Sequence, residues 1–506
     1  MSNTERIAKN TVVLYVRMVI VLLITLYTSR ILLKALGVDD YGLYSVVGGV
    51  VGLLTFFNGT MSKATQRFIN VSMIKGDDCL HTIFSNSVTI HILIAVAFLV
   101  LTETIGLWYL NTQVEIPLER EFAASMVYQA SVISFAVSIV TIPYNSAVIA
   151  YERMSFMAIV SIIDAVLKLG IAFILLVLSN DRLILYGILL LAITVVNFIL
   201  YSIYCKKKFP VLAFKISYDS KTFNELLGYI GWSFIGQMAI VGCNQGNILL
   251  VNKFHALAAN AAMTFGNQIS NALNNLTSNF QTAFNPQITK SYSEGDFKYL
   301  SSMVYTTSKI SFGILYVAAI PIMFNIDWVL SIWLDSVPQL TNTFAVLFII
   351  NGIINAISSP FHFAVLSSGN IRNYQIVTAL VFLSDIPLTY YLFTQGLPAT
   401  TVMEVKIGVI TTMFFVRVYF ASRIVSTIRF GKVCLEILLP MALTVIVTAS
   451  TLFLMNDYSI TTHHRFISTL LVEVINVIML WFILLKKSER NVLLSVIKVK
   501  NACVSR

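Results

Sequence analysis

Long apolar stretches that contain almost no charge recur from one end of this 506-residue chain to the other. About 20 apolar residues in a helix cross the hydrocarbon core of a bilayer. Only 11% of the residues are charged and 57% are hydrophobic, whereas a soluble domain carries roughly 25% charged residues. The sequence therefore predicts an all-α polytopic membrane protein and excludes soluble enzymes, DNA-binding proteins and secreted scaffolds.

The apolar stretches predict about 14 transmembrane helices. They are 11–36, 42–61, 82–108, 122–150, 155–178, 183–204, 228–252, 262–286, 303–325, 342–366, 374–394, 402–422, 434–455 and 466–485.

The net charge of +10 is best explained by membrane topology. Cytoplasmic loops of membrane proteins collect Lys and Arg. With both termini in the cytoplasm, most of the 34 basic residues fall in internal loops and tails, including Lys206 to Lys208 and the tail from Lys486. Lys406 is then assigned to an external loop. We expect no nucleic-acid partner, although the basic tail suits anionic lipid headgroups.

A shift of 219 residues brings the two halves of the sequence into register. It places Lys34 on Lys253 and Gly76 on Gly295. Because each half then holds six helices, the halves form parallel repeats, as in transporters that bind substrate between two lobes. We therefore predict an N-terminal lobe at 1–212, a C-terminal lobe at 213–430, and two further helices with a basic tail at 431–506.

The end of the first predicted helix carries a short motif. Thr28 to Gly37 (TSRILLKALG) runs into Asp39 to Tyr44 (DDYGLY). This resembles the opening of Wzx-type polysaccharide and O-antigen flippases, which belong to the multidrug/oligosaccharidyl-lipid/polysaccharide (MOP) exporter superfamily. The chain length, helix number and repeat agree with that resemblance.

The resemblance implies a function. It implies a non-enzymatic flippase that moves undecaprenyl-diphosphate-linked oligosaccharide across the bacterial cytoplasmic (inner) membrane by alternating access, for surface polysaccharide and lipopolysaccharide synthesis. Polysaccharide assembly proteins are candidate partners. A cation-coupled multidrug (MATE-like) antiporter and a membrane-embedded glycan polymerase are the alternatives, and a peptidoglycan-precursor flippase is not distinguished.

Basic residues within the predicted spans are candidates for a cationic lumen that binds the diphosphate. A charge at the bilayer centre is costly, so it needs a partner, water or a function. For Arg17 and Arg417, snorkelling to the cytoplasmic surface is an equal alternative. The predicted lumen residues are Arg17, Arg30, Lys34, Lys168, Lys253 and Lys309.

Two acids are candidates for ion coupling by H⁺ or Na⁺. Asp164 lies one turn before Lys168, so the two form either a neutralised structural pair or a coupling site beside a headgroup ligand. Asp385 lies mid-span and is either a proton carrier or a neutral hydrogen-bonded residue. We find no metal-ligand spacing and expect no other cofactor.

Amides and hydroxyls recur at helical spacing in the eighth predicted span. Lipid does not accommodate such a face, so it contacts protein or water. Amides both donate and accept hydrogen bonds, which suits sugar hydroxyls, and interhelical hydrogen bonding is the alternative. The predicted glycan contacts are Asn267, Asn271, Asn274 and Ser278.

Overall fold

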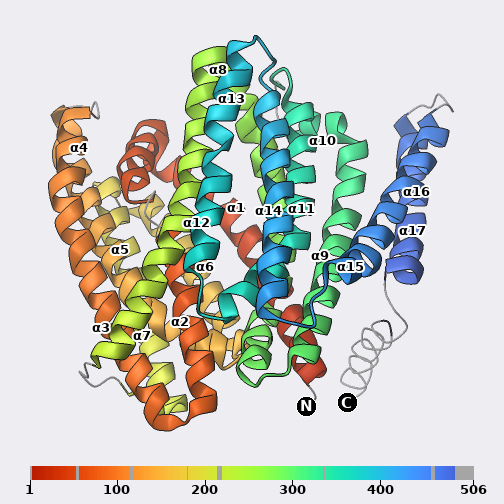
Figure 1. Ribbon diagram of the computed structural model, residues 1–506. Helices are drawn as coiled ribbons and strands as arrows, with labels where there is room; N and C mark the ends of the chain where they lie inside the picture. Colours follow the sequence, from red (N-terminus) through yellow and green to blue (C-terminus); the bar gives the residue numbers. More distant parts are fainter. Residues whose placement is uncertain are drawn as a thin grey trace, which may run out of the picture. The chain divides into compact units, whose positions relative to one another are not determined.

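The computed structural model is all α-helical in its described part (Figure 1). It describes residues 3–52, 56–113, 116, 118–178, 181–213, 219–333, 337–456, 462–484 and 490. The chain divides into an N-terminal unit, Lys9–Phe234, and a C-terminal unit, Met1–Ala8 with Ile235–Arg506. This division falls inside α8, 22 residues beyond the predicted lobe boundary at 212, and the predicted domain limits stay a prediction.

The helices of the N-terminal unit follow the predicted order. They are α1 (Asn3–Gly52), α2 (Phe56–Lys75), α3 (Asp77–Leu101), the π-helical η1 (Thr102–Gly106), α4 (Leu107–Gln113), η2 (Leu118–Arg120), α5 (Glu121–Ala150), α6 (Met154–Val177), α7 (Arg182–Lys208), η3 (Pro210–Leu212) and the start of α8 (Ser220–Ser293).

The C-terminal unit continues with α8 and carries the remaining helices. They are α9 (Phe297–Phe324), α10 (Ile326–Trp333), α11 (Thr341–Ser367), α12 (Arg372–Leu383), α13 (Asp385–Thr394), α14 (Thr401–Ile424), α15 (Phe430–Val433), η4 (Cys434–Leu438), α16 (Leu439–Asn456), α17 (Thr462–Met479) and η5 (Leu480–Leu484).

A capped helix start anchors α8 to the N-terminal unit. The Asp219 carboxylate accepts a hydrogen bond from the Thr222 backbone N–H at 2.9 Å, and the Asp219 N–H donates to Asn86 Oδ1 at 3.3 Å. Hydrogen bonds from Thr222 lower the pKa of Asp219 below its usual value. This cap therefore stabilises the fold above the unfolded-state pKa and is lost as pH falls through the lowered folded-state pKa.

The two halves of α8 pack in opposite senses. Near its start, Asn247 contacts Asp385 of α13, and a methyl on Gly236 would meet Gln375 of α12, so this half runs parallel to α12 and α13. Further on, Ser270 bonds the Phe348 carbonyl and Thr289 bonds Ser367, so that half runs parallel to α11. The link from α11 to α12 spans only residues 368–371, which makes these helices antiparallel. The α8 halves are thus two crossings.

Eleven described helices are long and apolar enough to cross a membrane, and Thr469–Leu484 is a shorter apolar helix. Of the 14 predicted spans, 466–485 corresponds to this shorter helix, and two others have no counterpart among these helices. The span at 42–61 includes residues 53–55, which lie outside the described part. The span at 262–286 is helical but polar, because Asn and Gln recur along it. The predicted multi-pass helical architecture is confirmed, and the number 14 stays a prediction.

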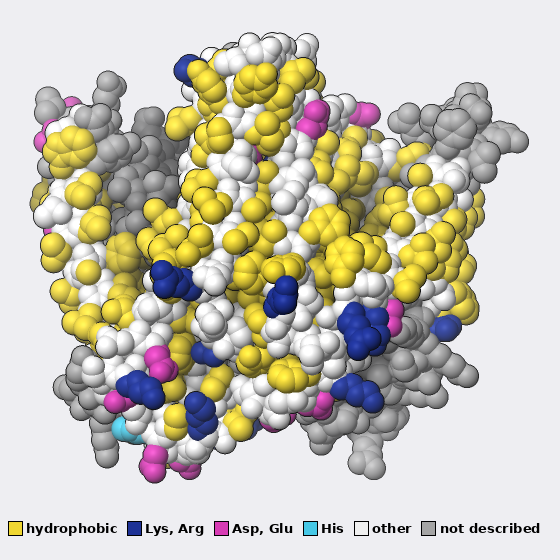
Figure 2. All heavy atoms as spheres, viewed as in Figure 1, with side chains coloured by type: hydrophobic (Ala, Val, Ile, Leu, Met, Phe, Trp, Pro, Cys, Tyr) yellow, Lys and Arg dark blue, Asp and Glu magenta, His cyan; other side chains and the backbone are white. Residues whose placement is uncertain are grey.

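Exposed apolar side chains cover the outer faces of several helices, as a lipid environment requires. Figure 2 shows them along α3, where Leu93, Val96 and Val100 are exposed. Inside the units, polar side chains mostly bond a carbonyl one turn earlier, as Ser87 does to Ile83. These contacts keep polar atoms out of the hydrocarbon region.

The 219-residue shift relates helix limits as well as residues. It moves Arg182, the first residue of α7, onto Thr401, the first residue of α14. It also moves Gly76 onto Gly295, and both glycines have positive φ angles, 109° and 76°, in the turns that precede α3 and α9. Only glycine adopts this backbone region without strain.

Alanine at either turn glycine is therefore expected to destabilise the protein through the backbone alone, because an added Cβ meets nothing within 4 Å at Gly76 or Gly295. We predict a cost of about 1–2 kcal/mol for Gly76→Ala and for Gly295→Ala. Thermal unfolding in detergent measures it. The control is Gly408→Ala in α14, where the space is equally open and φ is not positive, so an equal loss there contradicts the prediction.

Candidate polar and cationic site

A three-residue polar cluster lies between α6 and α7 in the N-terminal unit. Lys168 Nζ lies 2.8 Å from Asp164 Oδ2, and Asn197 Nδ2 donates to Asp164 Oδ1 at 2.7 Å. The i,i+4 spacing predicts this ion pair, and the structure confirms the pairing. The contribution of Asn197 was missed, because it comes from another helix.

The cluster leaves a positive charge accessible. Both Asp164 oxygens are engaged, whereas the Lys168 side chain is 47% exposed. Lys168 lies 14 residues after the start of α6, about 21 Å along the helix, and nine before its end. A lysine that is anchored at one side and open at the other is placed to meet an anion.

The cluster adjoins a cavity of about 380 Å³ in the same unit. Asn197 belongs to both. The lining comes from α2, α5 and α7 and is almost wholly amide, hydroxyl or backbone. The residues are Asn58, Gly59, Ser62, Ser138, Thr141, Ile142, Asn145, Thr194 and Asn197. Sequence reasoning missed this cavity, since its walls are scattered over 140 residues.

The predicted lumen residues of α1 are on the surface of the N-terminal unit. Arg30 and Lys34 are exposed, one turn apart. The opposite side of this turn, including Ile31 and Ala35, packs against Ile171 of α6. Helices α1 and α6 are thus neighbours. Arg17 is half-buried, and its Nε is buried without a hydrogen-bond partner.

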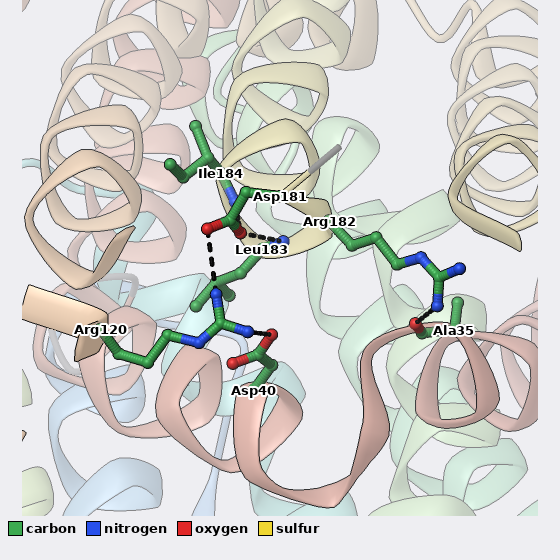
Figure 3. Close-up of polar contacts among 7 residues, drawn as sticks. All are labelled: Ala35, Asp40, Arg120, Asp181, Arg182, Leu183 and Ile184. Carbon is green, nitrogen blue, oxygen red and sulfur yellow. Dashed lines mark hydrogen bonds and ion pairs between the residues drawn. The ribbon is translucent and has the colours of Figure 1, made fainter. Parts of the chain in front are cut away.

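An ion cluster that the sequence did not reveal joins α1 to the residues that precede α5 and α7 in the N-terminal unit (Figure 3). Arg120 Nη2 lies 2.8 Å from Asp40 and its Nη1 lies 3.0 Å from Asp181. Arg182 Nη1 donates to the Ala35 carbonyl at 2.9 Å. Gly37 between them has φ 80° and breaks the helical path of α1. The two arginines therefore hold the chain on both sides of the break.

Asp385 is enclosed in the C-terminal unit and fully buried. Its carboxylate accepts hydrogen bonds from Cys243 Sγ at 3.0 Å, Asn247 Nδ2 at 3.1 Å and Thr389 Oγ1 at 3.0 Å. The structure therefore shows a partnered carboxylate, and its predicted coupling role is not tested by the contacts.

Two basic residues of α14 lie elsewhere than the sequence indicated. Lys406 belongs to the helix rather than an external loop, and its Nζ donates to Asn244 at 2.5 Å. Arg417 is only 7% exposed and donates to Asn355 and Ser358, so it does not snorkel to the surface. The loop assignment of Lys406 was wrong, and of the two alternatives for Arg417 snorkelling does not hold, because neighbouring helices supply neutral acceptors that compensate for lost water.

The remaining lumen candidates are in the C-terminal unit. Lys253 is exposed, and its Nζ lies 5.6 Å from the ring centroids of both Phe254 and Tyr390. Lys309 is 1% exposed, so it does not line an open surface of this unit as predicted. Among the described residues no group of three or more His, Cys, Asp or Glu is placed to hold a metal ion.

The predicted glycan contacts of α8 divide into two sets. Asn267, Asn271 and Ser278 are exposed on one face of the helix. Asn274 instead turns toward α11, where its Nδ2 donates to Ser270 at 3.2 Å beside Gly352. Asn274 thus packs beside α11 while its hydrogen bond stays within α8, and the exposed three stay available to a ligand.

Comparison with known proteins identifies the fold. No family model matches the chain, and no curated protein matches it. Solved structures do match. An outward-facing multidrug resistance MATE family transporter of the MOP superfamily aligns at TM-score 0.68 and 13% identity, covering 85% of this chain and 99% of that chain. MATE in the straight conformation gives 0.69 and 13%, with 84% and 97% covered.

A third match is a MOP superfamily transporter from Pyrococcus furiosus Vc1 (DSM3638), whose binding pocket is described as having reverse polarity. It aligns at TM-score 0.67 and 13% identity over 85% of this chain and 99% of that chain. The chain thus shares the helical fold of these solved MATE and MOP superfamily transporters. The assignment to Wzx-type flippases of the MOP superfamily stays a prediction.

The Asp164–Lys168 pair should behave as a coupled unit. We expect Asp164→Asn and Lys168→Gln each to lower thermal stability in detergent, and the double variant to lose less than the sum, because each single change leaves one charge without its partner. Exposure of Lys168 limits the coupling to about 0.5–1 kcal/mol. Additive losses would contradict the pairing.

The stability that the Arg120 cluster contributes should depend on salt concentration. We expect Arg120→Gln to cost about 0.5–1 kcal/mol for each of its two ion pairs at low ionic strength, because Arg120 itself is exposed. The difference from wild type should shrink in 1 M NaCl, where the screening length is about 3 Å. Lys206→Gln, on an exposed basic segment, is the matched control. A salt-independent loss would show that the cluster acts by packing.

Proposed function

We propose that the chain is a flippase that moves undecaprenyl-diphosphate-linked oligosaccharide across the bacterial cytoplasmic membrane by alternating access, for surface polysaccharide synthesis. In this proposal both termini are cytoplasmic, membrane lipids and polysaccharide assembly proteins are its partners, and Asp164 and Asp385 are the candidates for H⁺ or Na⁺ coupling. The fold supports transport of some substrate, and the polar residues support the choice of substrate.

One observation carries the proposal: cations within membrane helices of the N-terminal unit are exposed. Arg30, Lys34 and Lys168 lie on the neighbouring helices α1 and α6 and present their side chains outward. Lipid contact would cost several kcal/mol for each charge, so these side chains face water or an anionic ligand. A diphosphate supplies the opposite charge.

The two acids predicted to couple ions do not offer an equivalent site for an organic cation. Asp164 is neutralised by Lys168, and Asp385 is buried under three hydrogen-bond donors. A drug antiporter, which is the alternative function, needs an accessible carboxylate in its cavity. At these two sites the polarity therefore favours an anionic substrate over a cationic drug.

The proposal is tested by separating the charge of Lys168 from its structural role. We expect Lys168→Gln to abolish surface glycan on gels of a strain that lacks the wild-type gene, with unchanged protein in the membrane. The Asp164→Asn/Lys168→Gln double variant restores neutrality without restoring the cation, so it should also be inactive. Export by the double variant would assign Lys168 a structural role only and contradict the proposal.

A further inference from the structure

The cavity between α2, α5 and α7 contains hydrogen-bond acceptors that the protein does not satisfy. The side-chain carbonyl oxygens of Asn58, Asn145 and Asn197 are buried and have no partner. All three residues line the same cavity. Buried amide oxygens are nearly always hydrogen-bonded, since leaving one unpaired costs about 1–3 kcal/mol.

Hydrogen bonds from the amide nitrogens fix the orientation of Asn58 and Asn197. Asn58 Nδ2 donates to Ser138 at 3.1 Å, and Asn197 Nδ2 donates to Asp164 at 2.7 Å. The oxygens of these two residues are therefore held as acceptors, and a hydrogen-bond partner for them must be a donor.

The donor requirement narrows the class of ligand. Phosphate oxygens accept hydrogen bonds, so the diphosphate does not match this cavity. An apolar drug offers no donors, and Ile142 is the one large apolar residue among the described residues of the lining. A divalent metal ion favours carboxylate ligands, whereas Asp164 beside the cavity is already neutralised by Lys168. Neutral amide and hydroxyl oxygens also bind Na⁺, which the test below distinguishes. Sugar hydroxyls both donate and accept, and they match a lining of amides and hydroxyls.

We propose that this cavity binds a sugar residue of the lipid-linked substrate, next to the Lys168 ammonium. The inference rests on the proposed flippase function and places a glycan contact in the N-terminal unit, apart from the amides of α8. The volume of about 380 Å³ is within the range of small-ligand sites and suits one or two sugar rings. The asparagine oxygens accept from the sugar hydroxyls.

Gly59 allows the cavity to be filled without disturbing its walls. A Cβ on Gly59 meets nothing within 4 Å, so Gly59→Leu projects into open space. Gly228 in α8 is an equally open helical glycine outside the lining, and Gly228→Leu is the matched control. Binding is measured by native mass spectrometry on the purified full chain. The probes are undecaprenyl diphosphate, the same lipid carrying N-acetylglucosamine or galactose, free N-acetylglucosamine, and phosphatidylglycerol.

We expect a sugar-bearing lipid to bind wild type and Gly228→Leu at least about 10-fold more tightly than undecaprenyl diphosphate, a factor that two or three hydrogen bonds supply. Gly59→Leu should lose this gain and still bind undecaprenyl diphosphate normally, which shows that it is folded. Asn58→Ala/Asn145→Ala should reduce the gain without filling the cavity.

Several results overturn the inference. Equal binding of all undecaprenyl probes, or a gain that survives in Gly59→Leu, shows that the cavity holds only water. Free N-acetylglucosamine that binds as tightly as the lipid-linked form shows that the cavity recognises a free sugar. A Na⁺-dependent stabilisation that Gly59→Leu abolishes, with no sugar gain, assigns a cation. Failure of the flippase function itself is a different result: undecaprenyl diphosphate then binds no better than phosphatidylglycerol.

Discussion

The bilayer offers no hydrogen-bond partners, and the whole structure depends on satisfying polar groups within the chain. Helices satisfy the backbone. Side chains are satisfied by neighbouring helices, often with neutral groups: Arg417 bonds an amide and a hydroxyl, and Lys406 bonds Asn244. Amides and hydroxyls therefore supply hydrogen bonds to basic side chains that are removed from water.

The two repeats share a scaffold but not its chemistry. Asp164 and Asp385 lie on equivalent helices, only two residues out of register under the 219-residue shift. Each carboxylate accepts from an asparagine amide, but Asn197 comes from the following helix, α7, whereas Asn247 comes from α8. Asp164 has an exposed lysine beside it, and Asp385 is sealed. Equivalent helix positions in the two units therefore hold different polar sites.

Much of the fold was predictable from local patterns, whereas most of the site was not. Apolar length predicted the helices, the residue shift predicted equivalent turns at Gly76 and Gly295, and one-turn spacing predicted the pair of Asp164 with Lys168. Those signals are all local or periodic. The Arg120 cluster joins residues 80 and 61 positions apart, and the Asn58 contact to Ser138 spans 80. No periodicity encodes such pairs, because they depend on how separate helices pack.

The same distinction separates a structural polar residue from one that awaits a ligand. Charge alone does not identify a ligand-binding residue, because Lys309 and Arg417 are basic and yet enclosed. What distinguishes Asn58 and Asn197 of the N-terminal cavity is that their amide nitrogens donate hydrogen bonds while their oxygens are unpaired. An acceptor already fixed in place loses little side-chain entropy when a donor arrives, so each hydrogen bond contributes more of its strength to binding. The exposed Asn267 and Asn271 of α8 lack such anchoring. Preorganisation therefore favours the cavity over the polar face of α8 as the place where a sugar is recognised.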